Sequence, residues 1–527
     1  METSRADLWK VALAVVVALV LRIAYVGWGL PSETHDLNSY HPDENGVLIA
    51  LSNMNPSKGD FDTKTYYWGT AYFYMCGALF KALQLVGVLQ LVSNKTYYLD
   101  HLDQLDRMYL AGRILSLTLA VMSVPLIYYV GKRLFNPRTG IFAAALLAVL
   151  PIHVMRSPLM LPDGTGVFFL LLSLCCFVDA KNRKWFAIAG LFFGLACASK
   201  YHFFLTILFF ACVWVRDRKW PDAIAFASGA VVGFIVGCPY LFPNLPVLLG
   251  FIGKVAHGVS AGHGAILGEY RSQLLCALNM FLFAGGAFFL IASAISVDTI
   301  ARWQKDRFCL LLPFVLFTGL MGFSQTRLSY YMLPGVTFGV LLVAEWCQQN
   351  AKRGSIVIGG VVALSFLQSW SFAEPAWRTD TRTQMSNYLK EHIPAGTRIG
   401  VTHNKYFYTP PILMEKESYF QVEIFGDNFR DYNLDKLKRQ KPPYFVLSEF
   451  EWHEPSVHPE RAPERKAFID AIMNSGEYAL EKEGRASPSI LGLELPRITP
   501  PWNERVLYPT MRLYRANTMH RQNADAP

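Results

Sequence analysis

The stretch His41-Pro42-Asp43-Glu44 follows closely on an apolar run, Val11 to Leu30, that carries a single charge, Arg22. A run of this length provides the ~20 residues that an α-helix needs to cross the hydrocarbon core of a membrane. Two adjacent carboxylates at a membrane boundary require an explanation, because charge is costly near hydrocarbon. The pair therefore predicts an active site in the first outer loop. Asp163, directly before a later apolar run, predicts a further acid at the same face.

The composition is that of a membrane protein with a soluble portion. Hydrophobic residues make up 52% of the 527 positions and charged residues only 17%, a balance that is unusual for a soluble chain. The net charge of +9 does not predict nucleic-acid binding, because the basic residues cluster in short loops between apolar runs. The nine cysteines show no CxxC spacing, which argues against a disulfide framework or a zinc cluster.

The apolar runs also predict the topology. Windows of ~20 residues give about eleven transmembrane helices, near residues 9–30, 110–132, 139–157, 164–180, 185–200, 202–216, 222–239, 272–297, 308–324, 331–348 and 354–373. If these spans alternate, five basic clusters fall on one side, which the positive-inside rule makes cytoplasmic. The other side receives loop 31–109, loop 240–271 and the C-terminal tail. Within loop 31–109, Trp68 to Val92 is interpreted as an interfacial helix lying on the membrane.

From residue 374 the apolar runs shorten and turn signals appear. Helices are predicted at Met385 to His392 and Glu464 to Ile472, and strands at Arg398 to Thr402, Tyr444 to Ser448 and Met511 to Tyr514. The predicted fold class is an α-helical polytopic membrane protein over residues 1–373, followed by a small extracytoplasmic α/β domain over residues 374–527.

The acids allow two interpretations each. One carboxylate of Asp43 and Glu44 would take a proton from an acceptor hydroxyl, while the other would orient it or hold a metal. Alternatively, the pair caps a helix from Asn45 to Asn53. Asp163 is a second active-site acid or, equally, a helix cap.

Several arginine and lysine residues are predicted on the outer side of the membrane, where the positive-inside rule makes them uncommon. Arg113 and Arg327 are expected at outer membrane boundaries, against the usual bias of positive charge, and Lys200 is similar. Lys64 precedes the aromatic interfacial helix. Such cations suit the binding of a lipid phosphate, and the alternative is that they extend to the headgroups as ordinary boundary residues.

A metal site is a further alternative. His257 and His263 lie in the predicted outer loop 240–271, and with an acid of the first loop they would hold a divalent ion. The same spacing is typical of ordinary loop histidines. The glycines that follow Asp163 form neither a dinucleotide-binding nor a Walker pattern.

The order of these residues resembles the GT-C fold glycosyltransferases that use sugars linked to a lipid phosphate. They include the dolichyl-phosphate-mannose protein mannosyltransferases and the bacterial aminoarabinose transferase. The resemblance runs from about residue 10 to 373 and rests on Asp43-Glu44, Lys64 with Tyr66 and Tyr67, Arg113, Lys132-Arg133-Leu134-Phe135, Asp163, Ser199-Lys200-Tyr201, Arg327, Tyr330 and Pro334. One departure is Lys64-Thr65-Tyr66, where the family has lysine followed by two prolines.

This resemblance implies an inverting transfer of a sugar from a polyprenyl-phosphate donor to a glycan, lipid or protein acceptor. Asp43 would deprotonate the acceptor, and Glu44 and Asp163 would position the acceptor or a metal. The donor phosphate would be bound by Lys64, Arg113, Lys200, Arg327 and Tyr330. No cofactor is required on this account, because fixed cations suffice for a monophosphate leaving group.

Two other classes stay open from the sequence. A transporter or flippase of polyprenyl-linked lipids would explain the many spans, and a non-catalytic assembly subunit would leave Asp43 dispensable. Paired halves, common in transporters, are not evident. The expected location is the inner membrane of a bacterium, with membrane lipids as neighbours and no nucleic-acid partner.

Overall fold

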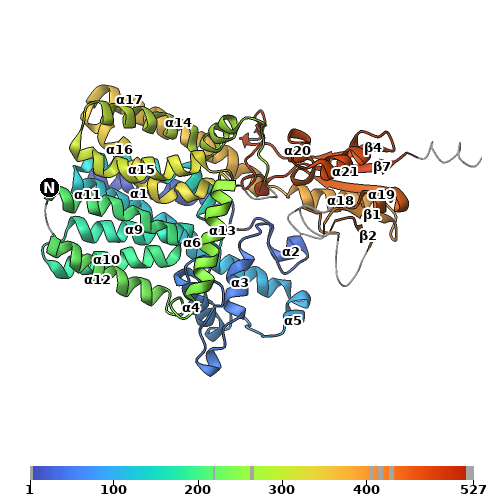
Figure 1. Cartoon of the computed structure of the whole chain (residues 1–527), viewed down its shortest axis with the longest axis horizontal. Coiled ribbons are helices and arrows are strands. Elements are labelled where there is room, and N and C mark those ends of the chain that lie inside the picture. Colours follow the sequence, from blue (N-terminus) through green and yellow to red (C-terminus); the bar gives the residue numbers. More distant parts are fainter. Residues whose placement is uncertain are drawn as a thin grey trace, which may run out of the picture.

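The computed structural model describes residues 4–217, 220–261, 266–403, 408–412, 419–426 and 432–517. Figure 1 shows helices gathered at one end of the molecule and a sheet with its own helices at the other. The helices before residue 374 are α1 (Arg5–Ile23), α2 (Pro31–Thr34), α3 (Asn45–Ser52), α4 (Ala71–Leu85), α5 (Lys95–Asp100), α6 (Leu102–Leu134), α7 (Pro137–Val149), α8 (Pro151–Arg156), α9 (Asp163–Val178), α10 (Arg183–Ser199), α11 (Ile207–Asp217), α12 (Trp220–Gly237), α13 (Leu245–Ala261), α14 (Gln273–Ala301), α15 (Lys305–Phe323), α16 (Leu333–Gln349) and α17 (Ala351–Ala373).

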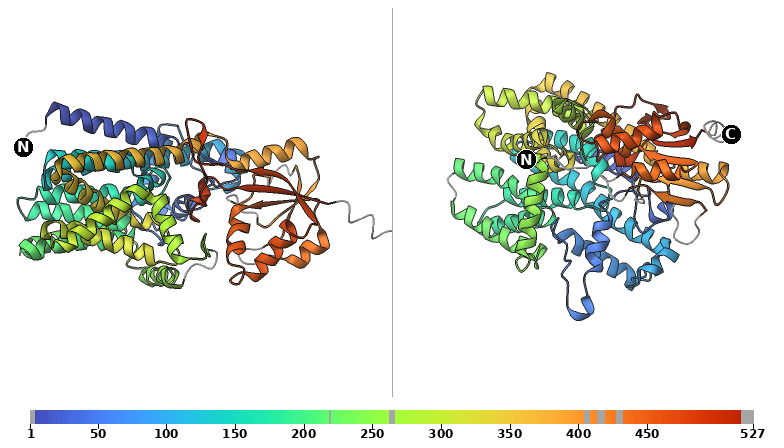
Figure 2. Two further views of the ribbon diagram at one scale, coloured as in Figure 1. Left: turned by 90° about the horizontal axis from the view of Figure 1, so that it is seen from above. Right: turned by 45° about the vertical axis from the view of Figure 1, so that its right-hand side comes forward.

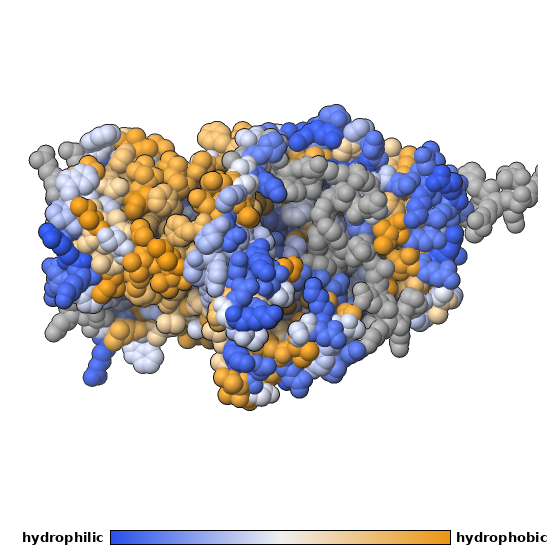
Figure 3. Space-filling view, turned by 60° about the horizontal axis from the view of Figure 1, so that its bottom comes forward, coloured by the Kyte–Doolittle hydropathy of each residue, from blue (hydrophilic) through white to orange (hydrophobic). Residues whose placement is uncertain are grey.

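The helical end carries the features of an integral membrane protein. Within the described residues, five helical stretches are long and apolar enough to cross a membrane, namely Leu102–Leu134, Trp220–Gly237, Gln273–Ala301, Ser329–Gln349 and Lys352–His392. Figure 3 shows apolar side chains gathered over the helical end of one face and hydrophilic side chains over most of the rest. The count of eleven transmembrane helices stays a prediction, because several of the other apolar helices are shorter than a full span.

Small residues allow the closest helix packing. A Cβ atom at Gly190 of α10 would lie 1.9 Å from the carbonyl oxygen of Phe226 in α12, and one at Gly229 of α12 would lie 1.9 Å from that of Ala187. The two helices therefore approach backbone to backbone, as small residues permit in membranes. This packing holds α10 in place, and α10 ends one residue before Lys200.

Some local predictions need correction. Loop 240–271 contains a helix, α13 (Leu245–Ala261), because its apolar residues recur with helical spacing on an exposed face. The predicted span 139–157 is divided into α7 and α8 at Pro151, which cannot continue the hydrogen bonding of α7. Helix α4 confirms a helix within Trp68 to Val92, whereas its position on the membrane surface stays a prediction.

The C-terminal part contains a mixed five-stranded sheet of order β2-β1-β3-β7-β4. Strand β1 runs parallel to β2 and β3, and β7 runs antiparallel to β3 and β4. Figure 2 shows this sheet beyond the ends of the helices. The elements are α18 (Thr381–His392), β1 (Arg398–Val401), β2 (Gln421–Ile424), α19 (Leu434–Gln440), β3 (Tyr444–Ser448), α20 (Glu449–Val457), α21 (Pro463–Met473), β4 (Tyr478–Gly484), β5 (Ser489–Ile490), β6 (Leu493–Glu494) and β7 (Met511–Ala516).

The predictions for this part were largely right. The structure confirms the three predicted strands as β1, β3 and β7, and both predicted helices as parts of α18 and α21. The edge strands β2 and β4 were missed, because their exposed and partly exposed residues give no apolar alternation. Side chains tie this part to the helical end, since the Trp28 indole donates to Asp380 at 3.1 Å.

Candidate active site

Glu44 and Arg113 form a fully buried ion pair. The guanidinium donates to both carboxylate oxygens, at 2.8 Å from Nε and 2.7 Å from Nη2. The same carboxylate accepts hydrogen bonds from the Ser39 hydroxyl at 2.5 Å and from the backbone N–H of Met160 at 2.7 Å. Burial by itself would raise the pKa of Glu44, but the charge and hydrogen bonds of Arg113 outweigh it and lower that pKa to about 2. Glu44 is therefore an ionised anchor.

Arg113 also donates to backbone carbonyls of the segment that follows α1. Its Nη1 donates to the backbone carbonyls of Trp28 at 2.6 Å and Val26 at 2.9 Å. One arginine on α6 thus holds the chain before and after Asp43. The carboxylate of Glu44 does not cap α3, although Glu44 occupies the N-cap position. The capping interpretation therefore fails for Glu44.

Asp43 is the accessible acid. Its side chain is 40% exposed, whereas that of its partner Arg156 is 9% exposed. Nη2 of Arg156 donates to the Asp43 carboxylate at 3.3 Å, and Nη1 of Arg156 lies 2.9 Å from the His41 ring nitrogen Nε2. Burial and the neighbouring positive charge of Arg156 lower the pKa of His41 to about 4. A neutral His41 therefore stands beside the arginine at neutral pH.

Asp163 lies between two cations. Its carboxylate accepts from Lys200 Nζ at 2.7 Å, and it lies 3.5 Å from Arg156 Nε. The Tyr330 ring covers both cations, with its centre 3.9 Å from the Arg156 guanidinium and 4.4 Å from the Lys200 nitrogen. We call Asp43, Arg156, Asp163 and Lys200 the charge cluster. Its formal charges cancel, and Asp43 is its open end.

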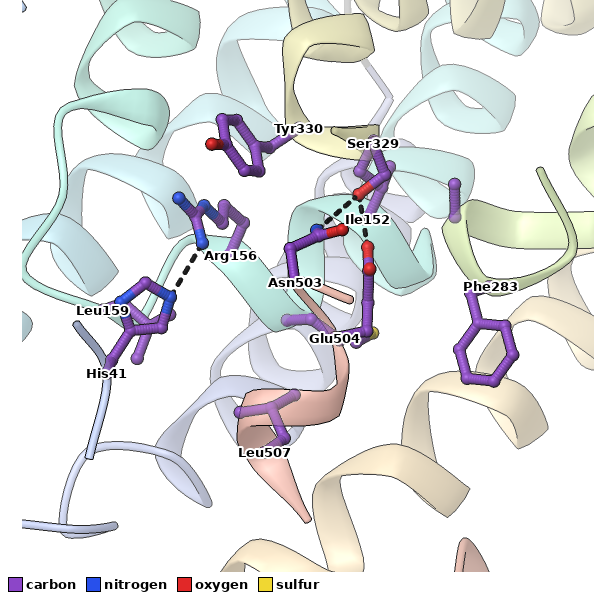
Figure 4. Close-up of a pocket in the computed structure, with 12 residues that line it drawn as sticks. His41, Ile152, Arg156, Leu159, Phe283, Ser329, Tyr330, Asn503, Glu504 and Leu507 are labelled. Carbon is purple, nitrogen blue, oxygen red and sulfur yellow. Dashed lines mark hydrogen bonds between the residues drawn. The ribbon is translucent and has the colours of Figure 1, made fainter. Parts of the chain in front are cut away.

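Arg156 of the charge cluster lines a small cavity of about 30 Å³, together with His41, Tyr330 and Glu504. Figure 4 shows its labelled residues, among which His41 points toward Arg156, and Glu504 and Asn503 of the C-terminal part point toward Ser329. The Ser329 hydroxyl donates to Oε1 of Glu504, and Oε2 of Glu504 has no hydrogen-bond partner within the part of the chain that the structure describes. The C-terminal part therefore supplies part of the wall of the site.

Burial raises the pKa of Glu504 to about 7, although Ser329 opposes the shift. The folded protein therefore keeps a proton that the unfolded chain loses above its ordinary pKa. Stability should fall as pH rises from about 4.5 to about 7, since the unfolded state binds fewer protons there. Thermal unfolding of Glu504→Gln should lose this slope, and an unchanged slope would contradict the assignment.

The remaining predicted residues lie outside the charge cluster. Lys64 is exposed in a backbone conformation of positive φ and forms no ion pair with a residue that the structure describes. Arg327 is buried, and its Nη2 donates to Gln273. His257 is exposed, and His263 lies outside the described residues. Among the described residues, no group of three histidines, cysteines or acids is placed to hold a metal.

The sequence analysis missed Arg156, His41 and Glu504 as site residues. Arg156 was included near the end of the predicted span 139–157, and in the structure it is the last residue of α8. An arginine in an apolar run is itself a signal of a polar neighbour. His41 belonged to the quoted stretch but had no visible partner. Glu504 had no local signal, because its neighbours in the site come from distant segments.

Part of the chain is similar to a known protein family. Residues 106–242 match the family model described as dolichyl-phosphate-mannose-protein mannosyltransferase. The matched segment holds Arg113, Arg156, Asp163 and Lys200, and it ends before Tyr330. No curated protein sequence matches the chain.

Solved structures give the fold. The apo oligosaccharyltransferase of Archaeoglobus fulgidus has a TM-score of 0.50 at 12% identity, covering 93% of this chain and 75% of that one. The archaeal oligosaccharyltransferase AglB from Archaeoglobus fulgidus, in complex with an inhibitory peptide and a dolichol-phosphate, also has a TM-score of 0.50 at 12% identity, covering 90% of this chain and 72% of that one. Apo ArnT from Cupriavidus metallidurans has a TM-score of 0.47 at 13% identity, covering 97% and 98%. The chain is thus an integral membrane protein with the GT-C fold, and its residues 106–242 are similar to the dolichyl-phosphate-mannose-protein mannosyltransferases.

Proposed function

We propose that this protein is an inverting glycosyltransferase that moves a sugar from a polyprenyl-phosphate donor to an acceptor on the outer face of the membrane in which it lies. The observation that carries the proposal is the open carboxylate of Asp43 at the end of a buried, charge-balanced cluster. The printed descriptions of the relatives support the donor class, since AglB was solved with a dolichol-phosphate and the matched family is named for a dolichyl-phosphate sugar.

In the proposed reaction Asp43 takes the proton of the acceptor hydroxyl or amide as that group attacks the anomeric carbon. The bond from this carbon to the phosphate oxygen breaks on the opposite face, so the configuration inverts and the lipid phosphate leaves with the electron pair. The Asp43 carboxylate accepts a hydrogen bond from Arg156 Nη2 at 3.3 Å. The acceptor would therefore have to displace part of the contact between Asp43 and Arg156.

The cations stabilise the departing phosphate in this proposal. Arg156 and Lys200 lie in a poorly hydrated site, where fixed charges act most strongly. Tyr330 orders both. Lys64 and Arg327 are proposed to contact the lipid phosphate from the edge of the site, because both lie on outer segments of the predicted topology. Glu44 and Arg113, which are fully buried, are reassigned from direct substrate contact to positioning the loop that carries Asp43.

The donor class can be tested directly. The purified protein in detergent would be given a polyprenyl-phosphate-linked sugar and a panel of lipid, glycan and peptide acceptors. Loss of sugar from the donor with release of polyprenyl phosphate supports the transferase. Transport has no meaning in detergent, so an intact donor with every acceptor, together with lipid movement across vesicles, would favour a flippase instead.

A metal requirement can be tested in the same assay. Because the leaving group is a monophosphate and the charge cluster supplies fixed cations, we expect turnover to survive chelation of divalent ions with EDTA. The control is the same preparation after Mg²⁺ or Zn²⁺ is added back. A loss of turnover that the added ion restores would contradict this expectation.

We propose that residues 374–527 form a separate domain outside the cytoplasm, with the protein in a bacterial inner membrane. The five basic clusters between apolar runs support this orientation. A reporter that is active only in the cytoplasm should give no signal when fused to the C-terminal end of the chain, and the same reporter inserted in the loop near Lys181 should give one. The reverse pattern would overturn the orientation and place Asp43 on the other side.

A further inference from the structure

The hairpin formed by β5 and β6 presents leucines to the outside. Its turn is Leu491-Gly492, and Leu491 is 83% and Leu493 is 75% exposed. Leu491 has a φ of 51°, a conformation that turns normally give to glycine, asparagine or aspartate. Neither the turn geometry nor packing within the chain therefore explains a leucine at this tip.

The backbone N–H groups at the tip of this turn are paired within the protein. The Glu374 carboxylate accepts hydrogen bonds from the backbone N–H groups of Leu491 and Gly492, both at 2.7 Å, and from the Ser489 hydroxyl at 2.9 Å. The indole of Trp370 donates to the same carboxylate at 3.0 Å. A turn that enters an apolar medium must have its amides paired internally. This turn meets that condition at its two tip residues.

The hairpin is held at the end of a helix in a stretch that is long and apolar enough to cross a membrane. Glu374 directly follows α17, whose side chains Leu364 and Leu367 are exposed. Trp370 lies in α17, and Trp377 follows four residues after the end of that helix. The centres of their two rings are 5.6 Å apart in an edge-to-face contact, and Trp377 is 52% exposed. Figure 2 shows this part of the chain where the helical end meets the sheet-containing end. Tryptophan is enriched at that depth of a membrane protein.

We propose that the β5–β6 hairpin inserts its tip into the interfacial layer of the lipid bilayer. Leu491 and Leu493 lie among the upper acyl chains, and Trp377 lies at headgroup depth. Arg378, which donates to Glu374 at 3.1 Å and is partly exposed, faces the lipid phosphates. The occupant is lipid rather than a protein partner, because the turn is held by Glu374 at the end of α17, in a stretch that is long and apolar enough to cross a membrane. The C-terminal part, which carries Glu504 of the site, is thereby held against the membrane at a second point.

Site-specific photo-crosslinking tests this inference. The full chain would carry benzoylphenylalanine at Leu491 or, separately, at Leu493, in vesicles of phosphatidylethanolamine and phosphatidylglycerol that contain a tagged phospholipid. The control is the same residue at Leu480, which is 50% exposed on β4 of the sheet. A benzophenone among acyl chains has lipid C–H bonds beside it, whereas one at an exposed position of the sheet faces water. Lipid adducts at either hairpin position should therefore exceed those at Leu480 several-fold.

The other outcomes are equally decisive. Adducts to a second copy of the chain or to another protein at both hairpin positions would overturn the inference in favour of a protein interface. A lipid yield no higher than at Leu480 would also overturn it. Each variant is compared with the parent protein by gel filtration and thermal unfolding before illumination, and having two hairpin positions guards against one that fails to fold. The glycosyl-transfer assay is not used, so the result is independent of the proposed function.

Discussion

Asp43→Asn should leave a folded protein that binds donor but does not turn over. The amide keeps the shape of the side chain and still accepts a hydrogen bond from Arg156, so the charge cluster should stay assembled. It cannot take a proton from the acceptor, and loss of a general base typically costs ~10²–10⁴-fold in rate. The measurement is sugar transfer from the polyprenyl-phosphate donor, with donor binding and thermal unfolding on the same preparation.

The matched control for Asp43→Asn is Asp103→Asn. Asp103 is an exposed acid at the start of α6 whose only described ion pair is with Arg107, at 3.4 Å. This variant makes the same chemical change in the same predicted outer loop and should keep parental turnover. Parental turnover in Asp43→Asn would eliminate Asp43 as the base. Glu44 could not take its place, because it is buried against Arg113.

Glu44→Ala should give the largest loss of stability. The change leaves the Arg113 guanidinium buried without its counter-charge and removes the acceptor for Ser39 and the Met160 amide. Breaking a buried pair by removing one partner typically costs about 3–5 kcal/mol. The measurement is the midpoint of thermal unfolding in detergent, with expression level as a second readout.

Two comparisons make this prediction specific. Asp103→Ala breaks an exposed pair and should cost no more than about 0.5 kcal/mol. The double variant Glu44→Met/Arg113→Met removes both charges and should recover much of the stability, since apolar replacements of buried pairs are often tolerated. If Glu44→Ala costs as little as Asp103→Ala, the pair is not an anchor.

The low pKa of Glu44 also fixes the sign of a pH effect. The folded protein holds this carboxylate ionised to about pH 2, whereas the unfolded chain protonates it near its ordinary pKa of about 4.5. The pair therefore contributes its full stabilisation above about pH 4.5 and loses it as the pH falls toward 2. Glu44→Gln should flatten that part of the stability profile.

Local sequence patterns predicted those helices and strands whose formation depends on a single property of the sequence, such as apolar length or alternation. Apolar length marked the membrane helices, because hydrocarbon admits only runs that satisfy their own backbone. Alternation and burial marked β1, β3 and β7. Alternation did not mark the edge strands β2 and β4, because most of their side chains are exposed or partly exposed. Helix α13 lies in the predicted loop 240–271, although its apolar residues recur with helical spacing.

For the site, the sequence by itself determined which charged residues lie beside apolar runs, where isolated charges are unfavourable. Asp43, Glu44, Asp163, Arg113 and Lys200 are charges next to apolar runs, and such charges need partners. Only the tertiary structure decided the pairing, which divides them into a buried anchor (Glu44 with Arg113) and an accessible cluster (Asp43, Arg156, Asp163 and Lys200). The physical reason is distance along the chain: Glu44 and Arg113 are separated by 69 positions, and Ser329 and Glu504 by 175. Local periodicity carries no information about which of many charges the packing of helices will bring together.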